Sequence, residues 1–227
     1  MNLRDNQQGF SLIEILVALG LIALVITSFT ASSGMFSNRQ KLEESLDNIQ
    51  RAIRFAQDEA ALKNKIVRIR FLLDKRPQEF AVEFGPSDNF VIPKSIVEQA
   101  DVETLDEQET LDKQKKDLNK KFSKVDEFQE DNFKFPEEVR VVSYGSTLFN
   151  SLINEGEISM YFYPSGEKDS AIFFIGTDEE LSTLSVPSFT MDFELEFIKA
   201  SEEGELDELS ETYAEDAKKI FEEWLKG

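Results

Sequence analysis

Glu14 is the only charged residue in an apolar stretch at residues 10–29. No other residue of the chain has surroundings that limit its chemistry so strongly. A carboxylate in hydrocarbon costs about 2.5–3.5 kcal/mol, so a segment that served only as an anchor would favour leucine there. Since a carboxylate gains more from a cation in an apolar medium than in water, we expect Glu14 to form an ion pair.

Gly9 and Phe10 precede this stretch in an order that differs from a secretory signal peptide. A signal peptide places its apolar region before a small-residue cleavage site. Here the small residue, Gly9, comes before the apolar region. Cleavage after Gly9 would therefore leave the apolar segment on the mature protein, with Phe10 as its first residue and Glu14 about one helical turn further on.

The element that positions these residues is a long helix predicted over residues 10–64. Its first twenty residues, 10–29, would be roughly 30 Å long, which is enough to cross a bilayer. The chain has no proline before Pro77, and the sequence at 32–34, Ser-Ser-Gly, is where we expect a bend. Beyond it an apolar stripe follows helical spacing at Leu42, Leu46, Ile49, Ile53, Ala56 and Ala60. This stripe is either a core face or a filament-packing surface, and we expect the former.

Gly9, Phe10, Glu14 and the apolar stretch together resemble the prepilin signature of type IV pilins and type II secretion pseudopilins. The resemblance implies that residues 1–9 are a leader, that prepilin peptidase cleaves after Gly9, and that Phe10 is N-methylated. It also implies that Glu14 pairs with the N-terminal ammonium of a neighbouring subunit. Arg4 beside Asp5 departs from the basic leaders usual in the family. The alternative is a plain signal anchor.

The rest of the chain indicates an α+β protein with a β-rich head over residues 65–200. Alternating apolar residues bounded by turn residues predict strands at 66–73, 79–84, 138–144, 158–163, 171–175 and 189–198. We expect them to form an antiparallel sheet or β-sandwich against the long helix, with a turn at 85–88 closing the first hairpin.

Two charged segments depart from the strand pattern. The insertion at residues 94–135 predicts one helix along Leu111, Leu118, Phe122 and Val125, which is either a partner-binding arm or a solvated excursion. Residues 201–227 predict an acidic C-terminal helix. Trp224 would anchor that helix on its own domain or on a partner, and we expect its own domain.

Two further segments resemble the H-type minor pseudopilins and FimT-like pilins (the GspH/FimT family). These are the helix-to-strand passage at 55–67 and the sequence Tyr-Pro-Ser-Gly at 163–166. Gln57 departs from the arginine expected at its position. The resemblance implies a minor filament subunit, held in the inner membrane with its C-terminal head in the periplasm, of a type II secretion pseudopilus or a type IV pilus. Its expected partners are prepilin peptidase, other subunits of the filament and, as a further possibility, a secreted substrate.

Composition argues against catalysis and nucleic-acid binding. The chain lacks cysteine and histidine, so thiol chemistry and the commonest general base are missing. No phosphate-binding or dinucleotide motif occurs, and we expect no cofactor, metal or enzymatic activity. The acidic run at 178–180 is either a solvated turn or a calcium ligand set, and we expect a turn. A net charge of −20 repels phosphate backbones. The competing class is a membrane-anchored periplasmic adaptor that never assembles.

Overall fold

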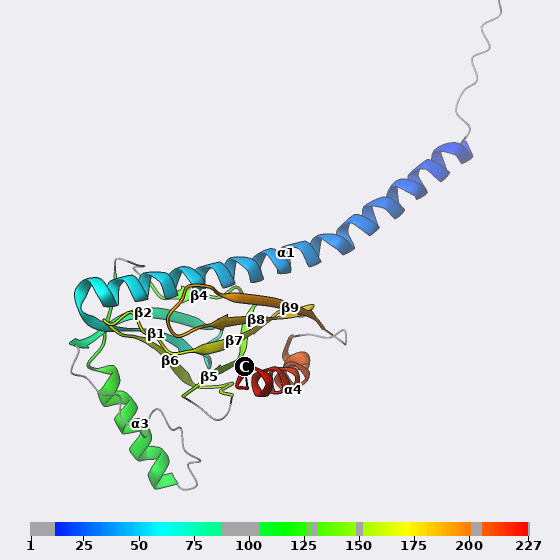
Figure 1. Cartoon of the computed structure of the whole chain (residues 1–227). Helices are drawn as coiled ribbons and strands as arrows, with labels where there is room; N and C mark the ends of the chain where they lie inside the picture. The colour runs from blue at the N-terminus through cyan, green and yellow to red at the C-terminus, as the bar shows by residue number, and fades with distance from the viewer. Residues whose placement is uncertain are drawn as a thin grey trace, which may run out of the picture.

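A long helix, α1 (Leu12–Lys63), lies along one side of the head with its second half and projects beyond the head with its first half (Figure 1). The computed structural model describes residues 12–87, 105–126, 128, 131–148, 152–200 and 206–226, and it leaves undescribed the side chains at 24–36, 105–108 and 207–211. With 52 residues, α1 is about 78 Å long. It continues without interruption through residues 32–34, so the predicted bend does not break the helix.

The apolar stripe on the second half of α1 is confirmed as a core face. Its six residues are all buried, with exposed fractions of 1% or less: Leu42, Leu46, Ile49, Ile53, Ala56 and Ala60. Their spacing places them on one side of the helix, where they join the main hydrophobic core. The helix ends at Lys63, and Asn64, in a left-handed conformation with φ of 52°, turns the chain into the first strand.

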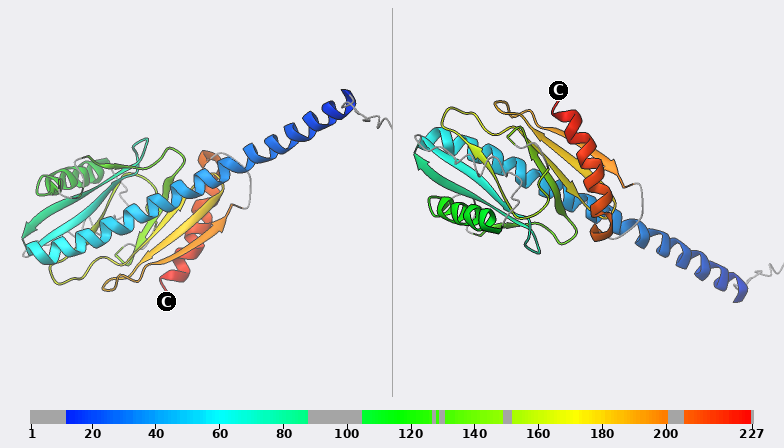
Figure 2. Two further views of the ribbon diagram at one scale, coloured as in Figure 1. Left: turned by 90° about the horizontal axis from the view of Figure 1, so that it is seen from above. Right: turned by 90° about the horizontal axis from the view of Figure 1, so that it is seen from below.

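In the part of the chain that the structure describes, nine strands form two antiparallel sheets under α1 (Figure 2). The first sheet has the order β3-β2-β1-β6, with β4 also pairing with β2, and the second has the order β5-β7-β8-β9. The strands of the first sheet are β1 (Lys65–Leu72), β2 (Glu79–Ser87), β3 (Ser123–Lys124), β4 (Phe133–Lys134) and β6 (Glu157–Phe162). Those of the second are β5 (Arg140–Ser146), β7 (Ala171–Gly176), β8 (Glu180–Val186) and β9 (Glu194–Lys199).

Alternation along the strands builds the core between the sheets and α1. In β1, Val67, Ile69 and Phe71 belong to the same buried cluster as the α1 stripe. In β7, Phe173 and Ile175 join that cluster, while Ile172 and Phe174 point to the opposite face. Each sheet therefore needs a cover on its outer face as well.

Two helices provide these outer covers. The C-terminal helix α4 (Leu206–Trp224) packs Tyr213, Ala217 and Phe221 against Ile172 and Phe174 of the second sheet. Trp224 donates a hydrogen bond of 2.9 Å from its indole nitrogen to the Ser185 hydroxyl. The predicted docking of this helix on its own domain is confirmed.

The inserted helix α3 (Leu105–Asn119) lies on the outer side of the first sheet (Figures 1 and 2). Leu118 and Phe122 pack there against Ile66 and Tyr161. Phe122 and Val125 lie beyond the end of the helix, because the chain turns at Lys120 and then pairs as β3 with β2. The prediction of one helix through Val125 was therefore wrong at its C-terminal end. The predicted insertion also includes residues 94–104, which lie outside the described residues.

The α+β class and the arrangement of a helix on antiparallel sheets agree with the prediction, but several strands do not. β3 and β4 lie within the predicted helical insertion and were not predicted. β8 was not predicted, because its sequence, ELSTLSV, has short polar residues at buried positions. β9 begins at Glu194, five residues after the predicted start. Gly85 lies inside β2 rather than in a turn, and a Cβ there would stand 3.1 Å from the Ile66 carbonyl oxygen.

Candidate functional site

Glu14 lies in the first turn of α1, on a part of the helix that projects away from the head. Its side chain is exposed. Within the described part of the chain no hydrogen bond or ion pair engages its carboxylate. A single carboxylate of this kind accepts hydrogen bonds and pairs with a cation, and such a group would have to come from outside the described residues.

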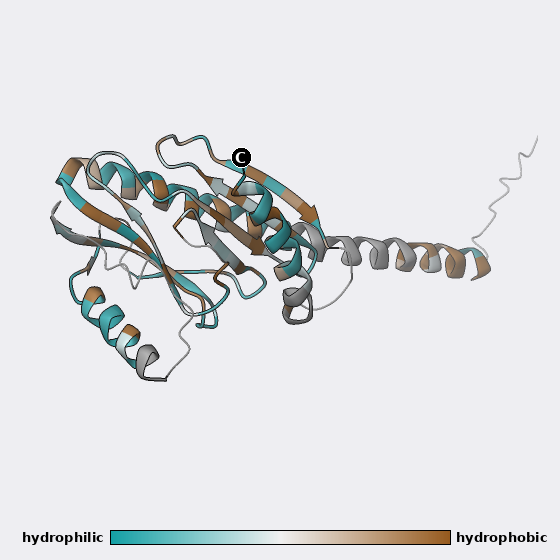
Figure 3. Cartoon of the chain, turned by 60° about the horizontal axis from the view of Figure 1, so that its bottom comes forward, coloured by the Kyte–Doolittle hydropathy of each residue, from teal (hydrophilic) through white to brown (hydrophobic). Residues whose placement is uncertain are grey.

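Large apolar side chains surround Glu14 on every side of the helix. Each of them is more than half exposed: Leu12, Ile13, Ile15, Leu16, Val17, Leu19, Leu21 and Ile22. The end of α1 in Figure 3 is accordingly coloured mostly as hydrophobic. A helix that is apolar all round is a helix that other apolar groups must cover. A search limited to the described side chains finds no helix both long enough and apolar enough to cross a membrane.

Gly9 and Phe10, the predicted cleavage site, lie outside the described residues. Their roles remain predictions. Glu14 lies four positions after Phe10 in the sequence, and four positions correspond to about 6 Å along a helix axis. The structure therefore describes the acidic partner of the proposed pair but not the site of processing.

α1 is clamped to the head where it leaves the second sheet. The guanidinium carbon of Arg39 lies 3.5 Å from the centroid of the Phe197 ring on β9. Arg39 also pairs with Glu180 at the start of β8 and, at 2.7 Å, with Glu43 on its own helix. The hydrogen bond with Glu43 contributes most to raising the pKa of Arg39, and Glu180 adds to the rise.

Two more polar contacts support the same end of the head. Asn38 donates a hydrogen bond of 2.8 Å to Asp178 in the turn between β7 and β8. Lys41 lies 2.6 Å from Glu138, and this hydrogen bond is the main reason that the pKa of Glu138 is lowered. The direction in which α1 leaves the head is thus determined by contacts from several elements.

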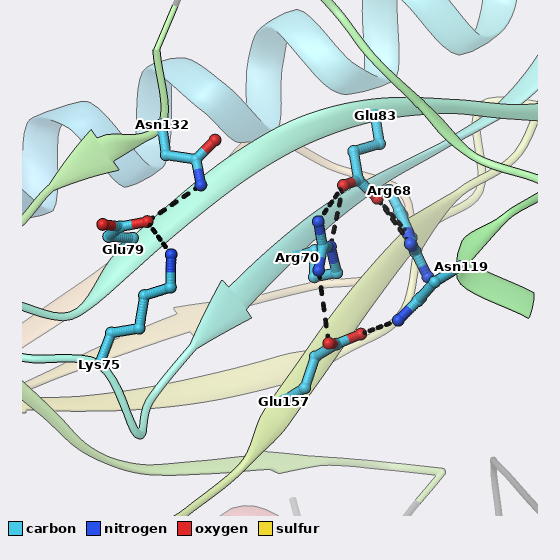
Figure 4. A network of polar contacts seen from close by, with 8 residues as sticks. All are labelled: Arg68, Arg70, Lys75, Glu79, Glu83, Asn119, Asn132 and Glu157. Carbon is cyan, nitrogen blue, oxygen red and sulfur yellow. Dashed lines mark hydrogen bonds and ion pairs between the residues drawn. The ribbon is translucent and has the colours of Figure 1, made fainter. Parts of the chain in front are cut away.

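A charged network lies on the outer face of the first sheet, under the end of the insertion (Figure 4). Arg68, with a side chain 1% exposed, lies 2.6 Å from Glu83, which is 7% exposed. Arg70 pairs with the other oxygen of Glu83 and, at 3.4 Å, with Glu157. Burial opposes the charged form of Arg70, but Glu83 outweighs it, so the pKa of Arg70 is raised.

The insertion closes over this network. Asn119, the last residue of α3, donates a hydrogen bond of 2.8 Å to Glu157. The Phe122 ring lies over the Arg68 guanidinium, with its centroid 3.9 Å from the guanidinium carbon. Paired charges and an aromatic cover of this kind are a structural arrangement that fastens the insertion to the sheet.

Asp169 is a buried carboxyl group beside β6, away from this network. Its carboxylate accepts a hydrogen bond of 2.8 Å from the backbone N–H of Tyr161, and its own N–H donates to the Tyr161 carbonyl. Burial raises the pKa of Asp169 to about 7, against the opposing effect of the hydrogen bond from Tyr161. The Asp169 carboxylate thus accepts from a backbone N–H of β6 in the place of a neighbouring strand's carbonyl. This is a structural role.

A metal site and an activated nucleophile each need particular side chains close together. Among them no group of three acidic, histidine or cysteine side chains could hold a metal ion. An open hollow of about 440 Å³ has Arg76, Gln78 and Arg140 in its wall, and another of about 580 Å³ lies beside Phe221 and Leu225 of α4. The wall of neither hollow contains a serine or tyrosine that a neighbouring base could activate.

The two segments of the head that resemble H-type pilins contact each other. The Gln57 side chain, on α1, donates a hydrogen bond of 3.0 Å to the Gly166 carbonyl in the turn after β6. Gly166 has a φ of 86°, which favours glycine. The contact ties the end of α1 to that turn.

Comparison with known proteins identifies one region of the chain. Residues 4–30 match the family model described as the prokaryotic N-terminal methylation motif. The match contains Gly9, Phe10 and Glu14, so the chain has a type IV prepilin-like N-terminus. No curated protein sequence matches the chain. No solved structure matches it either, so the resemblance of the head to H-type pseudopilins is not confirmed.

Proposed function

We propose that this protein is a structural subunit of a type IV pilus-like filament, and specifically a minor pseudopilin of a type II secretion pseudopilus or a related assembly. The observation that carries the proposal is the division of α1 into two halves. The second half buries its apolar face in the head, whereas residues 12–22 expose their apolar side chains around Glu14. The methylation motif covers this same exposed segment.

The exposed segment suits a subunit that moves from a membrane into a filament. In the membrane, lipid tails would cover the apolar side chains. In a filament, the corresponding helices of neighbouring subunits would cover them. Because both surroundings are apolar, one sequence serves in both, and the head remains folded on the second half of α1 throughout.

Glu14 has a specific role in this proposal. After cleavage, Phe10 carries a terminal ammonium group, and the carboxylate of Glu14 on the next subunit pairs with it. In an apolar surrounding such a pair stabilises one register of neighbouring helices over others. Before assembly, this ion pair forms within the membrane only where two subunits meet. Because an unpaired carboxylate is costly in lipid, Glu14 disfavours arrangements of neighbouring helices that leave it without a cation.

The proposed location is the inner membrane, with a single span near the N-terminus and the head in the periplasm. The absence of cysteine from the sequence is compatible with that compartment. The partners are prepilin peptidase, the other subunits of the filament and, through the exposed surface of the head, a secreted substrate. The acidic charge of the chain argues against a nucleic-acid partner.

Mass spectrometry of the mature N-terminus tests the proposal. The full chain is expressed with a prepilin peptidase, purified from membranes and digested. The expected product is a peptide that begins at N-methylated Phe10. A Gly9→Val variant is the matched control and should retain Met1. If the parent chain also keeps Met1 in cells with an active peptidase, the proposal is wrong and the anchored adaptor is favoured.

Sheared surface filaments distinguish the remaining alternatives. A filament subunit of either kind is recovered with the filaments, whereas a membrane-anchored adaptor stays in the membrane fraction. Co-purification then separates the secretion pseudopilus from a FimT-like pilus, since the chain should associate with the other minor subunits of only one of the two systems.

A further inference from the structure

The two sheets of the head end in strand edges, and the chain covers the edge of β5 with its own atoms. The Gln78 side chain accepts a hydrogen bond of 2.7 Å from the Val141 N–H and donates one of 3.1 Å to the Val141 carbonyl. Further along this edge, Ile153 and Tyr144 exchange backbone hydrogen bonds of 2.8 and 2.9 Å. Pairing within the chain leaves no row of backbone groups here for another strand.

The edges of the first sheet are closed in comparable ways. On β6, Asp169 bonds the Tyr161 N–H with its carboxylate at 2.8 Å and the Tyr161 carbonyl with its own N–H at 3.1 Å. Just beyond the strand, the Tyr163 N–H donates a hydrogen bond of 2.8 Å to the Glu167 carbonyl. On the other side of the sheet, β3 and β4 have only two residues each, and such short strands offer little to pair with.

The outer edge of β9, the last strand of the second sheet, differs from these edges (Figure 1). Its register with β8 runs without a shift from Glu194 to Lys199, and the Ala200 N–H then donates a hydrogen bond of 2.9 Å to the Glu179 carbonyl. Because hydrogen bonds alternate along an antiparallel pair, every second residue of β9 directs its N–H and C=O away from β8. These residues are Leu195, Phe197 and Lys199, and we call their row of backbone groups the open edge. Within the described part of the chain, no hydrogen bond reaches it.

The side chains of β9 give its two faces different chemistry. Phe193 and Phe197 pack against the main core on the side of α1, and Leu195, on the same face, is 38% exposed. Glu194 and Glu196 lie on the opposite face and are both exposed. A strand added to the open edge would continue both faces. It would therefore place apolar side chains beside Leu195 and, to suit the two glutamates, cations on the other face.

We propose that the open edge binds an extended segment of a different protein, in which basic side chains alternate with apolar ones, as a further strand of the second sheet. Backbone hydrogen bonds hold the segment, and the alternation selects it. The six residues of β9 are about 20 Å long, which is enough to pair with a segment of equal length. The inference goes beyond the proposed function and does not depend on it, because the open edge belongs to the head.

Two other occupants suit the open edge less well. If β9 of a second copy paired there, Glu194 and Glu196 of both copies would lie on one face, and like charges across a strand pair are destabilising. The net charge of −20 adds to the repulsion between copies. A helix cannot use the edge, since its backbone groups are already bonded to one another.

Hydrogen exchange at single-residue resolution tests the proposal on the detergent-solubilised full chain. In the free chain, the amides of Leu195 and Phe197 should exchange quickly and those of Glu196 and Ile198 slowly. The probe is a synthetic peptide, long enough to span β9, in which lysine alternates with valine. It should slow exchange at Leu195 and Phe197 by about tenfold or more and leave the other two amides nearly unchanged.

Two N-methylated forms of the peptide separate strand addition from simple attraction between charges, since both keep every lysine charge. An added strand bonds through only one of its two rows of N–H groups. In antiparallel addition that row belongs to the valines, so methylation of the valine nitrogens should abolish the protection and methylation of the lysine nitrogens should preserve it. The reverse result also supports strand addition, in the parallel sense. Equal protection by the two forms would overturn the inference.

Variants of β9 complete the test. Leu195→Pro removes an outward N–H without touching the ladder to β8, and it should abolish protection of Phe197 by the peptide. Leu195→Thr keeps the N–H and is the matched control. In case Leu195→Pro unfolds the chain, Glu194→Lys with Glu196→Lys should transfer the protection to a peptide in which glutamate alternates with valine. The inference is wrong if the amides of Leu195 and Phe197 are already protected in the free, dilute chain, or if no peptide protects them.

Discussion

Arg39 on α1 lies over the Phe197 ring on β9, with 3.5 Å between the guanidinium carbon and the ring centroid. These residues are far apart in the sequence, and their contact joins the base of the projecting helix to the last strand of the second sheet. After Arg39 in the sequence, the apolar stripe of α1 is buried in the head. Before Arg39, the helix projects from the head. The contact therefore marks the boundary between the two halves of α1.

Arg39→Ala should weaken the attachment of α1 to the head. The side chain is partly exposed, so removing the ring contact and the pair with Glu180 should lower the free energy of unfolding by about 1 kcal/mol. Urea unfolding of the detergent-solubilised full chain, followed by the fluorescence of its single tryptophan, measures this. Lys63→Ala, which removes a pair at 4.0 Å with Glu59, is the control and should change little. Equal effects of the two variants would contradict a special role for Arg39.

Glu83→Gln should be far more destabilising, because it leaves two arginines without their shared carboxylate. Arg68 is buried with its charge, and breaking such a pair costs about 3 kcal/mol or more. The double variant Arg68→Met with Glu83→Leu removes both buried charges and should be more stable than Glu83→Gln. Both are measured by the same urea unfolding experiment. A Glu83→Gln protein as stable as the parent would show that the network contributes nothing.

Asp169 should make the head less stable as the pH rises from about 4 to about 7. Its pKa is raised in the folded state to about 7, from an ordinary value of 3.8, so over this range the folded state holds a proton that the unfolded state has lost. The slope from this residue approaches about 1.4 kcal/mol per pH unit and vanishes above pH 7. Asp169→Asn cannot titrate, so the parent and the variant should differ by this slope in unfolding experiments across the range. Parallel curves would contradict it.

Elements whose pattern is strong were predictable from the sequence alone. The stripe from Leu42 to Ala60 and the alternation in β1 place apolar residues on one face at the period of a helix or a strand, and burial follows from that pattern. β8 was missed because Ser182 and Thr183 are buried although they are polar. Ser182 donates a hydrogen bond of 2.8 Å to the Ile175 carbonyl, a neighbour on β7 that sequence spacing does not reveal.

Of the candidate site, the sequence predicted the isolated residue but not the contacts between elements. Glu14 was evident as an isolated charge in an apolar segment, and the motif match covers it. The clamp at Arg39 and the pair of Arg68 with Glu83 were not, because each joins elements brought together only by the fold. A charged residue in an alternating strand, such as Arg68 between Val67 and Ile69, was the one available signal that the outer face of β1 is polar.

Gly145→Ala should loosen α4 from the second sheet. A Cβ at this position would overlap the Phe221 ring of α4 and stand 3.0 Å from a methyl carbon of Leu152. Overpacking of this kind costs about 1–3 kcal/mol. Phe221→Leu in the same chain makes room and should recover part of the loss, whereas Phe221→Leu alone should destabilise. Limited proteolysis of the C-terminal segment reports on docking directly, and an undisturbed cleavage pattern in Gly145→Ala would contradict the tight fit.

Glu14→Ala should allow processing but impair assembly. The substitution leaves Gly9 and Phe10 unchanged and makes the segment more apolar, so cleavage and membrane retention should persist. The variant loses the carboxylate that would pair with the ammonium group of the next subunit, and its recovery in sheared filaments should fall sharply. Glu14→Gln keeps the size and the hydrogen-bonding oxygen without the charge. If the Glu14→Gln variant assembles as poorly as the Glu14→Ala variant, the charge is what matters, since a neutral amide cannot replace an ion pair in an apolar surrounding. Normal recovery of the Glu14→Ala variant in filaments would remove the proposed role of Glu14.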